Sequence, residues 1–168
     1  MRVILRKGYP AIITYATPVW GGVNQTELFK TLKRQHCRAA RSIFGFPSDM
    51  PTADVLATVK WNTFTYMYKR SLIKLFVKGY HGMLPSTLAE ELIIHGDRPS
   101  SRLKHGLIAP SFAEYVQNSI SYTGAVLWNA IGRTNKSILV CTDLKSFLKN
   151  VVNCNTFKDF NFNVIAHK

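Results

Sequence analysis

Residues 24–45 read NQTELFKTLKRQHCRAARSIFG, and this stretch decides the fold class. Asn24 and Glu27 have the spacing of a capping box, and Gly45 supplies a helix stop. At about 100° per residue, apolar and basic side chains fall on opposite flanks of one helix. The apolar flank gathers Leu28, Leu32, Ala39 and Ile43, and the basic flank gathers Lys30, Arg34, Arg38 and Arg41. The stretch predicts an amphipathic helix whose hydrophobic flank packs inward and whose basic stripe faces outward.

Helical periodicity continues along the rest of the chain. Further helices are expected at residues 2–17, 52–60, 62–79, 85–96, 119–131 and 142–152. Asn62 or Thr63 opens the third of these, which ends at Gly79, and Thr142 caps the last. Gly124 leaves a strand open as the alternative for 119–131. We therefore predict an all-α orthogonal bundle of five to seven helices, with a basic connecting loop over residues 97–118.

The chain carries a large positive charge that is unevenly distributed. It has 22 Lys and Arg against 9 Asp and Glu, for a net charge of +13. Residues 1–84 contain thirteen basic and three acidic side chains, so the first half holds +10 of that charge. Nucleic acid is the commonest polyanion to neutralise such a surface, and ordinary solubility is the alternative.

Cysteine content and hydropathy indicate a location inside the cell, in the nucleus or the cytoplasm. Three irregularly spaced cysteines, Cys37, Cys141 and Cys154, do not make a disulfide framework. No apolar run approaches the roughly 18 residues of a membrane-spanning helix. The apolar stretch after Arg2 is bracketed by prolines and lacks a cleavage site, so we expect neither secretion nor membrane attachment.

The chemistry of a nucleotidyl transferase is not expected in this chain. Such enzymes hold two metal ions with convergent carboxylates, which reverse transcriptases supply as adjacent aspartates. The only adjacent acids here are Glu90 and Glu91, which on a helix point about 100° apart. No P-loop and no zinc-ligand spacing around Cys37 occurs either. We predict no catalysis, no metal site and no cofactor.

A basic surface is the remaining candidate for function. Cations about one helical turn apart can follow a phosphate backbone without reading bases. With about five such contacts, log affinity falls against log salt with a slope of roughly −4 to −5. The candidate nucleic-acid-binding residues are Lys30, Lys33, Arg34, Arg38, Arg41, Arg70, Lys74, Lys78, Arg102 and Lys104.

A series of short motifs occurs in a characteristic order between about Tyr9 and Lys149. The segment Val19-Trp20-Gly21 is followed by Arg38-Ala39-Ala40-Arg41 and later by Ser119-x-x-Tyr122-x-Gly124-Ala125-x-Leu127-Trp128-Asn129. This order resembles the thumb and adjoining C-terminal region of non-LTR (LINE-type) retrotransposon reverse transcriptases. The positions that carry the resemblance are Tyr15, Trp20, Gly21, Trp61, Pro85, Tyr122, Gly124, Trp128 and Asn129.

The resemblance implies a parent RNA-directed DNA polymerase whose palm binds magnesium and whose thumb grips the template–primer duplex. Only the grip is expected in this chain, with RNA, DNA or hybrid duplex and the missing fingers and palm as partners. Residues 1–96 are then a thumb-like helical region, and residues 97–168 a loop and C-terminal helical region packed on it or part of the same domain. The motif aromatics lie on apolar faces, so we expect them to pack between helices rather than stack on bases.

Two other functions stay open. The chain could be an inert remnant or a protein–protein module that uses the surface which once met the palm. It could also restore polymerase activity together with a separately encoded palm.

Overall fold

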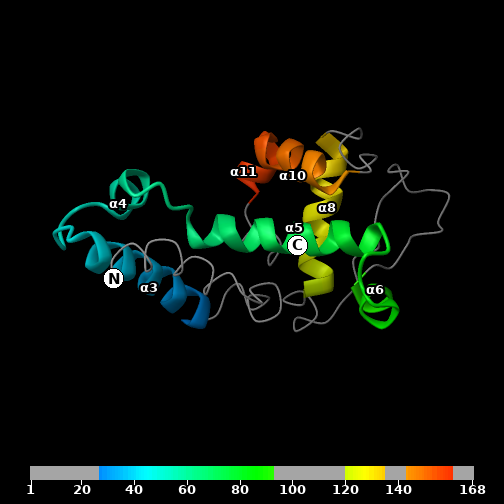
Figure 1. The fold of residues 1–168 in the computed structure, drawn as a ribbon, viewed down its shortest axis with the longest axis horizontal. Coiled ribbons are helices and arrows are strands. Elements are labelled where there is room, and N and C mark those ends of the chain that lie inside the picture. Colours follow the sequence, from blue (N-terminus) through cyan, green and yellow to red (C-terminus); the bar gives the residue numbers. More distant parts are fainter. Residues whose placement is uncertain (1–26, 93–119, 135–142, 161–168) are drawn as a thin grey trace. The chain divides into compact units, whose positions relative to one another are not determined.

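The computed structural model describes residues 27–92, 120–134 and 143–160. These residues form helices and no strand (Figure 1). The helices are α3 (Glu27–Phe44), α4 (Thr52–Thr58), α5 (Phe64–Tyr80), α6 (Ser86–Leu92), α8 (Ile120–Thr134), α10 (Leu144–Asn153) and α11 (Asn155–Asp159). The all-α prediction is confirmed. The strand left open for 119–131 is wrong, because that segment forms α8.

The chain divides into two compact units, Met1–Tyr68 and Lys69–Lys168. The start of α5, residues 64–68, therefore belongs to the first unit, and the rest of that helix belongs to the second. A boundary between residues 96 and 97 was expected from the sequence, and it lies outside the described residues. The helix expected at 2–17 and the loop expected at 97–118 also lie outside them.

Helix α3 ends where the sequence predicts. Gly45 adopts φ +75°, and the N–H groups of Gly45 and Phe46 both donate to the carbonyl of Arg41, at 2.7 and 3.1 Å. A residue in the left-handed conformation, followed by a residue whose N–H bonds a carbonyl five positions earlier, is a Schellman-type helix end. Glycine adopts this conformation without a Cβ penalty. The proposed cap residue, Asn24, lies outside the described residues.

The inward face of α3 differs from the predicted one. Its fully buried side chains are Phe29, His36 and Ala40, whereas Leu32 and Ile43 are only half-buried. By helix geometry, the centre of the buried face is rotated by about 70° from the predicted apolar flank. The phenylalanine was left out of that flank, and the histidine was not expected to be buried.

Three aromatic contacts and one hydrogen bond fix this orientation of α3. The Phe29 ring meets Phe64 and Tyr68 edge-on, with ring centroids 5.0 and 5.7 Å apart. The His36 ring stacks on Trp61 at 5.4 Å and lies 3.0 Å, at Nε2, from the carbonyl oxygen of Asn62. Since a carbonyl can only accept, that nitrogen is the donor, and the bond lets a polar ring occupy a core position.

Helix α4 packs against α3 and ends in a strained turn. Val55 and Leu56 join Ala40 of α3 in one buried cluster. Lys60 follows with φ +56°, and the N–H of Trp61 returns to the carbonyl of Leu56 at 2.9 Å. This is the same stop as at the end of α3, with lysine in the position that favours glycine. The turn was not anticipated from the sequence.

The bounds of α5 differ from the prediction mainly at its C-terminal end. The Thr63 hydroxyl accepts a hydrogen bond from the N–H of Tyr66 at 3.2 Å, so Thr63 is the cap. The helix runs past Gly79 to Tyr80, and the left-handed residue is Gly82, at φ +67°. The helix thus extends one residue beyond Gly79, and the glycine that ends it is Gly82.

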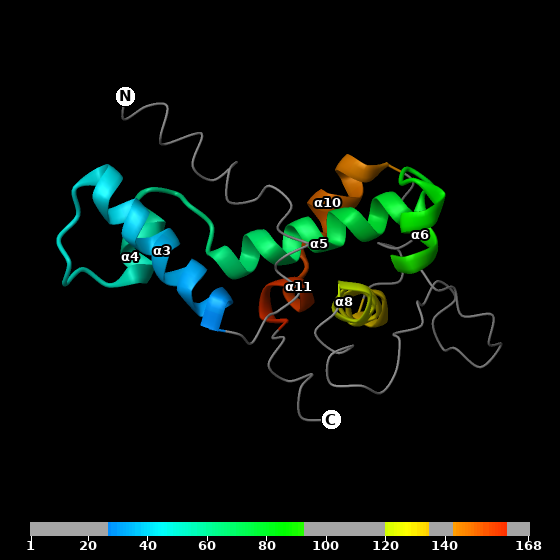
Figure 2. The same cartoon turned by 90° about the horizontal axis from the view of Figure 1, so that it is seen from below.

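In the second unit, α8 crosses α5 steeply instead of running alongside it (Figures 1 and 2). Gly124 makes this crossing close, since a Cβ at that position would overlap the ring of Phe76 in α5. A glycine that appears from the sequence to weaken the helix is therefore a packing position. Phe76 itself is fully buried.

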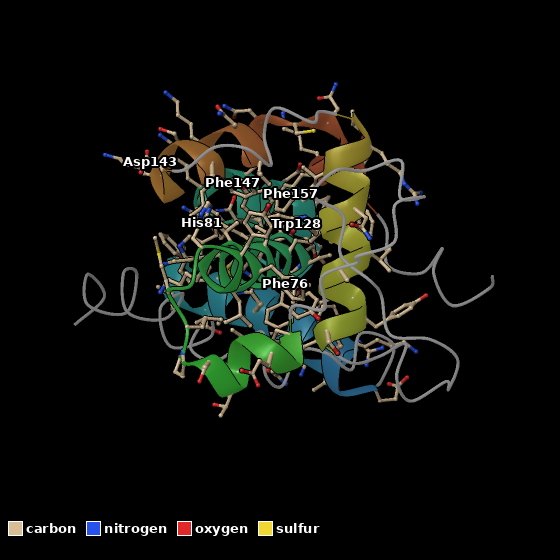
Figure 3. The ribbon with its side chains drawn as sticks, turned by 90° about the vertical axis from the view of Figure 1, so that its right-hand side faces the viewer. Phe76, His81, Trp128, Asp143, Phe147 and Phe157 are labelled. Atoms are coloured by element: carbon tan, nitrogen blue, oxygen red, sulfur yellow. The ribbon has the colours of Figure 1, made fainter. Side chains whose placement is uncertain are left out.

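The core of the second unit is aromatic. Trp128 in α8 is fully buried and stacks on Phe147 of α10 at 5.6 Å, and Phe157 of α11 is also fully buried. Figure 3 shows these three side chains gathered between α8 and α10, with Asp143 at the start of α10. Asp143 caps α10 by accepting from the N–H groups of Lys145 and Ser146 at 3.2 and 2.9 Å.

The C-terminal part of the chain differs from the prediction in one cap and one added helix. The cap of α10 is Asp143 and not the neighbouring Thr142. The aspartate takes over because α10 begins at Leu144, two residues later than the predicted start. Helix α11 was not predicted at all, since its five residues are too short for a periodic pattern.

Candidate nucleic-acid interface

Three cations form a row along α3. Lys30, Arg34 and Arg38 are exposed and follow one another every four residues. The row therefore advances by about 6 Å per side chain and drifts only slowly around the helix. The only carboxylate in α3 is Glu27. We call Lys30, Arg34 and Arg38 the α3 row.

The first member of the α3 row has a local partner. The Lys30 Nζ atom lies 2.7 Å from Glu27 Oε1, and their side chains are 56% and 76% exposed. The hydrogen bond and charge of Lys30 hold the pKa of the Glu27 carboxyl below its usual value of 4.5. Exposed pairs of this kind are weak and exchange readily with another anion. Arg34 and Arg38 are thus the better placed of the three to meet phosphate.

Lys33 lies on a different flank from the α3 row. Its Nζ atom is 4.6 Å from the centroid of the Phe29 ring, one turn earlier on the same helix. Burial of its stem lowers the pKa of Lys33. A cation over an aromatic ring is stabilised by that contact, and it would lose this stabilisation on binding phosphate. Lys33 therefore extends the positive field of α3 without belonging to the row.

Arg41 has a structural role that its place in the predicted stripe did not suggest. The residue is half-buried, and its Nη2 atom donates to the Met50 carbonyl at 2.8 Å and to the Thr52 hydroxyl at 3.2 Å. The same residue's carbonyl receives the two N–H groups that end α3. Arg41 therefore connects the end of α3 to the start of α4. Its guanidinium is thus partly engaged in this turn, unlike the exposed side chains of Arg34 and Arg38.

The predicted cations of α5 lie in the second unit. Arg70 and Lys74 are exposed and Lys78 is half-buried, again at four-residue spacing. Helix α5 contains no carboxylate. These three residues form a second row of cations.

A cation missed by the sequence analysis lies beside this second row. Lys69 is 94% buried, and its Nζ atom donates to the carbonyls of Phe157 and Lys158, both at 3.2 Å. Burial lowers the pKa of Lys69, and the Asp159 carboxylate partly opposes that shift. Phe157 and Phe160 place their rings 5.9 and 6.0 Å from the same ammonium.

Lys69 therefore ties α11 to α5 and is not a surface cation. The carbonyls it binds are at the end of α11, where a positive charge is favoured. A signal was present in the sequence, because position 69 shares the i, i+3, i+4, i+7 pattern of the buried residues Leu72, Ile73 and Phe76.

The motif residues that the structure describes are mainly packing positions. Trp128 is fully buried, with the ring centroids of Tyr80 and Phe147 at 5.2 and 5.6 Å from its own. Trp61 is half-buried against the α3–α4 cluster. Both tryptophans therefore pack against other side chains of the fold. Of the other described motif residues, Gly124 is buried, Tyr122 and Asn129 are half-buried, and Pro85 is exposed immediately before α6.

Five of the predicted site and motif residues lie in segments that the structure does not describe. Arg102 and Lys104 of the connecting loop, and Tyr15, Trp20 and Gly21 of the first motif, lie outside the described residues.

Metal ligands and membrane spans were both searched for in the described part of the chain. No group of three or more His, Cys, Asp or Glu side chains there could hold a metal ion. Among the same residues, none of the helices has the length and apolar character needed to cross a bilayer.

The described site is thus a linear array of exposed cations on a rigid helix, which can bind a chain of phosphates by charge and spacing. Comparison with known proteins adds no relative, since no family model, no curated protein and no solved structure matches this chain.

Proposed function

We propose that this chain is a non-catalytic nucleic-acid-gripping piece of a non-LTR retrotransposon reverse transcriptase, acting inside the cell. Its ligand is an RNA, DNA or hybrid duplex, bound mainly through phosphates. The observation that carries the proposal is the α3 row, in which Lys30, Arg34 and Arg38 are exposed at regular spacing on a helix with one carboxylate. The family assignment rests on the order of sequence motifs described above.

The helix supports such a grip in two ways. Its opposite face is anchored by the buried side chains of Phe29, His36 and Ala40, so the row is carried on a rigid backbone. The row also repeats at the spacing of one helical turn, which suits phosphates, and phosphate contacts alone position a protein without specifying bases. Binding is therefore expected to be weak, salt-dependent and tolerant of sequence.

A protein–protein module is the second candidate. Met83 and Leu88 are the large apolar side chains described as exposed, at 55% and 38%. They lie between the end of α5 and the first turns of α6, away in sequence from the α3 row. A partner held there would be captured with little salt dependence, and no shift of RNA or DNA would accompany it.

Charge reversal at two positions tests the proposal. We would measure fluorescence anisotropy of labelled DNA, RNA and hybrid duplexes with the wild type and with the pair Arg34→Glu and Arg38→Glu. The pair is expected to weaken binding by about tenfold or more, because two attractive contacts become repulsive. Circular dichroism should remain helical, since both side chains are exposed.

A control pair separates the row from overall charge. Lys145→Glu and Lys149→Glu make the same change in net charge at two exposed positions, four residues apart on α10. This pair should bind within about threefold of wild type. Equal loss in both pairs would mean that net charge and not the α3 row binds the duplex. A wild type that binds none of the three duplexes would contradict the proposed function.

A further inference from the structure

Three half-buried aromatic rings gather where α3 ends. Phe44 and Phe46 are close to parallel, at 20°, with centroids 6.2 Å apart, and Trp61 meets Phe44 edge-on at 5.8 Å. Phe46 and Trp61 pack against the buried Ala40–Val55–Leu56 cluster on one side. We call Phe44, Phe46 and Trp61 the aromatic platform.

The aromatic platform is close to the α3 row on the helix surface. Phe44 lies about 80° around the helix from Arg34, between the buried face and the cations. Along the axis, the ten residues that separate them span about 15 Å, a distance covered by a few nucleotides of an extended strand. A strand that follows the row toward the C-terminal end of α3 therefore reaches the platform.

The platform is held in place by bonds described above. Gly45 turns the chain, the Phe46 N–H donates to the Arg41 carbonyl at 3.1 Å, and the Arg41 side chain holds Met50 at 2.8 Å. Phe46 therefore lies in a turn that Arg41 holds at both ends, through its carbonyl at Phe46 and through its side chain at Met50. A rigid ring of this kind costs little ordering when a base stacks on it.

The charges around the platform favour one orientation of a bound strand. Asp49 in the turn and Asp54 on α4 are exposed and repel phosphate, whereas the cations lie on α3. A strand on the platform therefore keeps its phosphates toward α3 and its bases toward the rings. Duplex cannot use the rings in this way, because its bases are already stacked and paired.

We propose that the aromatic platform takes an unpaired base of a single-stranded segment, which stacks on Phe46 while the α3 row binds the phosphates of that segment. The inference rests on the proposed function and narrows its ligand to nucleic acid with an unpaired stretch. Stacking on aromatic side chains tolerates any base, so the preference is for strand state and not for sequence.

The first test needs no variant. We would measure the affinity of the wild type for oligothymidylate and for an abasic oligonucleotide of the same length, which has the same phosphates and no bases. The thymidylate should bind about fivefold or more tightly, which corresponds to one stacked base. Equal affinities would overturn the inference and leave the proposed function standing. Failure to bind either oligonucleotide or duplex would overturn both.

The second test uses Phe46→Leu, which keeps an apolar contact with the buried cluster and removes the ring. The preference for thymidylate over the abasic strand should shrink to about threefold or less, with abasic affinity unchanged. Equal weakening of both affinities would contradict stacking. Phe160→Leu makes the same exchange at a half-buried ring of the second unit and should leave both affinities as in the wild type.

Discussion

The Arg41 guanidinium of α3 donates to the Met50 carbonyl across 2.8 Å, so a member of the predicted basic stripe holds the turn before α4. Arg41→Ala removes this bond and the weaker one to Thr52 and should lower the free energy of unfolding by about 1–3 kcal/mol. Urea denaturation measures the change. Arg38→Ala is the matched control, because Arg38 is exposed, and should change stability by less than about 0.5 kcal/mol.

The same two variants separate structure from ligand contact. Each phosphate contact contributes about 0.9 to the slope of log affinity against log salt. Arg38→Ala should reduce the magnitude of that slope by about 0.9, the contribution of one contact. Arg41→Ala should leave the slope unchanged under conditions in which the variant is folded. A slope that falls in Arg41→Ala would return Arg41 to the phosphate-binding residues.

Gly124→Ala should destabilise the second unit even though alanine is the better helix former. The added Cβ would overlap the Phe76 ring, and overpacking of a core typically costs about 1–3 kcal/mol. The gain in helix propensity is only about 1 kcal/mol. Thermal unfolding followed by circular dichroism measures the balance. In the Phe76→Leu background the same substitution should cost less, and equal costs in both backgrounds would rule out this contact as the cause.

Lys60→Gly should stabilise the first unit by about 0.5–1 kcal/mol, because Lys60 has φ +56° and glycine adopts that conformation without a Cβ penalty. Lys60→Ala is the control for charge, since alanine removes the ammonium and keeps the Cβ. It should give little or no gain in urea denaturation. A gain as large as that of glycine would show that relief of charge, and not of backbone strain, stabilises the turn.

Stability should fall as the pH decreases below about 6.5. Burial lowers the pKa of His36 below its usual 6.5, and its bond to the Asn62 carbonyl only partly opposes this. The unfolded state then binds the proton more tightly, so stability is fully present above about pH 6.5 and is lost below it, by at most about 1.4 kcal/mol per pH unit. The pKa values of Glu27 and Asp143 are also lowered, from 4.5 and 3.8, and these two carboxyls therefore affect stability only at pH values near or below those figures.

His36→Gln isolates this effect, because the glutamine amide can donate to the same carbonyl and does not titrate. Urea denaturation at three pH values should give a flatter profile for the variant than for the wild type. Two profiles of equal slope would place the titrating group elsewhere.

Helix positions could be predicted from the sequence to a large extent, because periodic apolar residues and punctuating Gly, Thr and Pro mark them directly. The start of α5 at Thr63 and the end of α3 at Gly45 are examples. The buried face of α3 could not be assigned correctly, because the burial of His36 depends on a carbonyl 26 residues away. Such a partner exists only in the folded chain.

The candidate site could be predicted only in part. The spacing of Lys30, Arg34 and Arg38 gave the row, since exposed cations are expected opposite an apolar face. Charge alone could not separate them from Arg41 and Lys69, which bind carbonyls in segments 9 and 88 residues away. The aromatic platform was missed because its three rings, Phe44, Phe46 and Trp61, come together only through the turns that end α3 and α4.

The most direct test of the central claim is the salt dependence of duplex binding by the wild type between about 50 and 200 mM salt. With three phosphate contacts from the α3 row, log affinity should fall against log salt with a slope of roughly −3, smaller than expected for five contacts. A slope near zero, or no duplex binding at the lowest salt, would contradict the account.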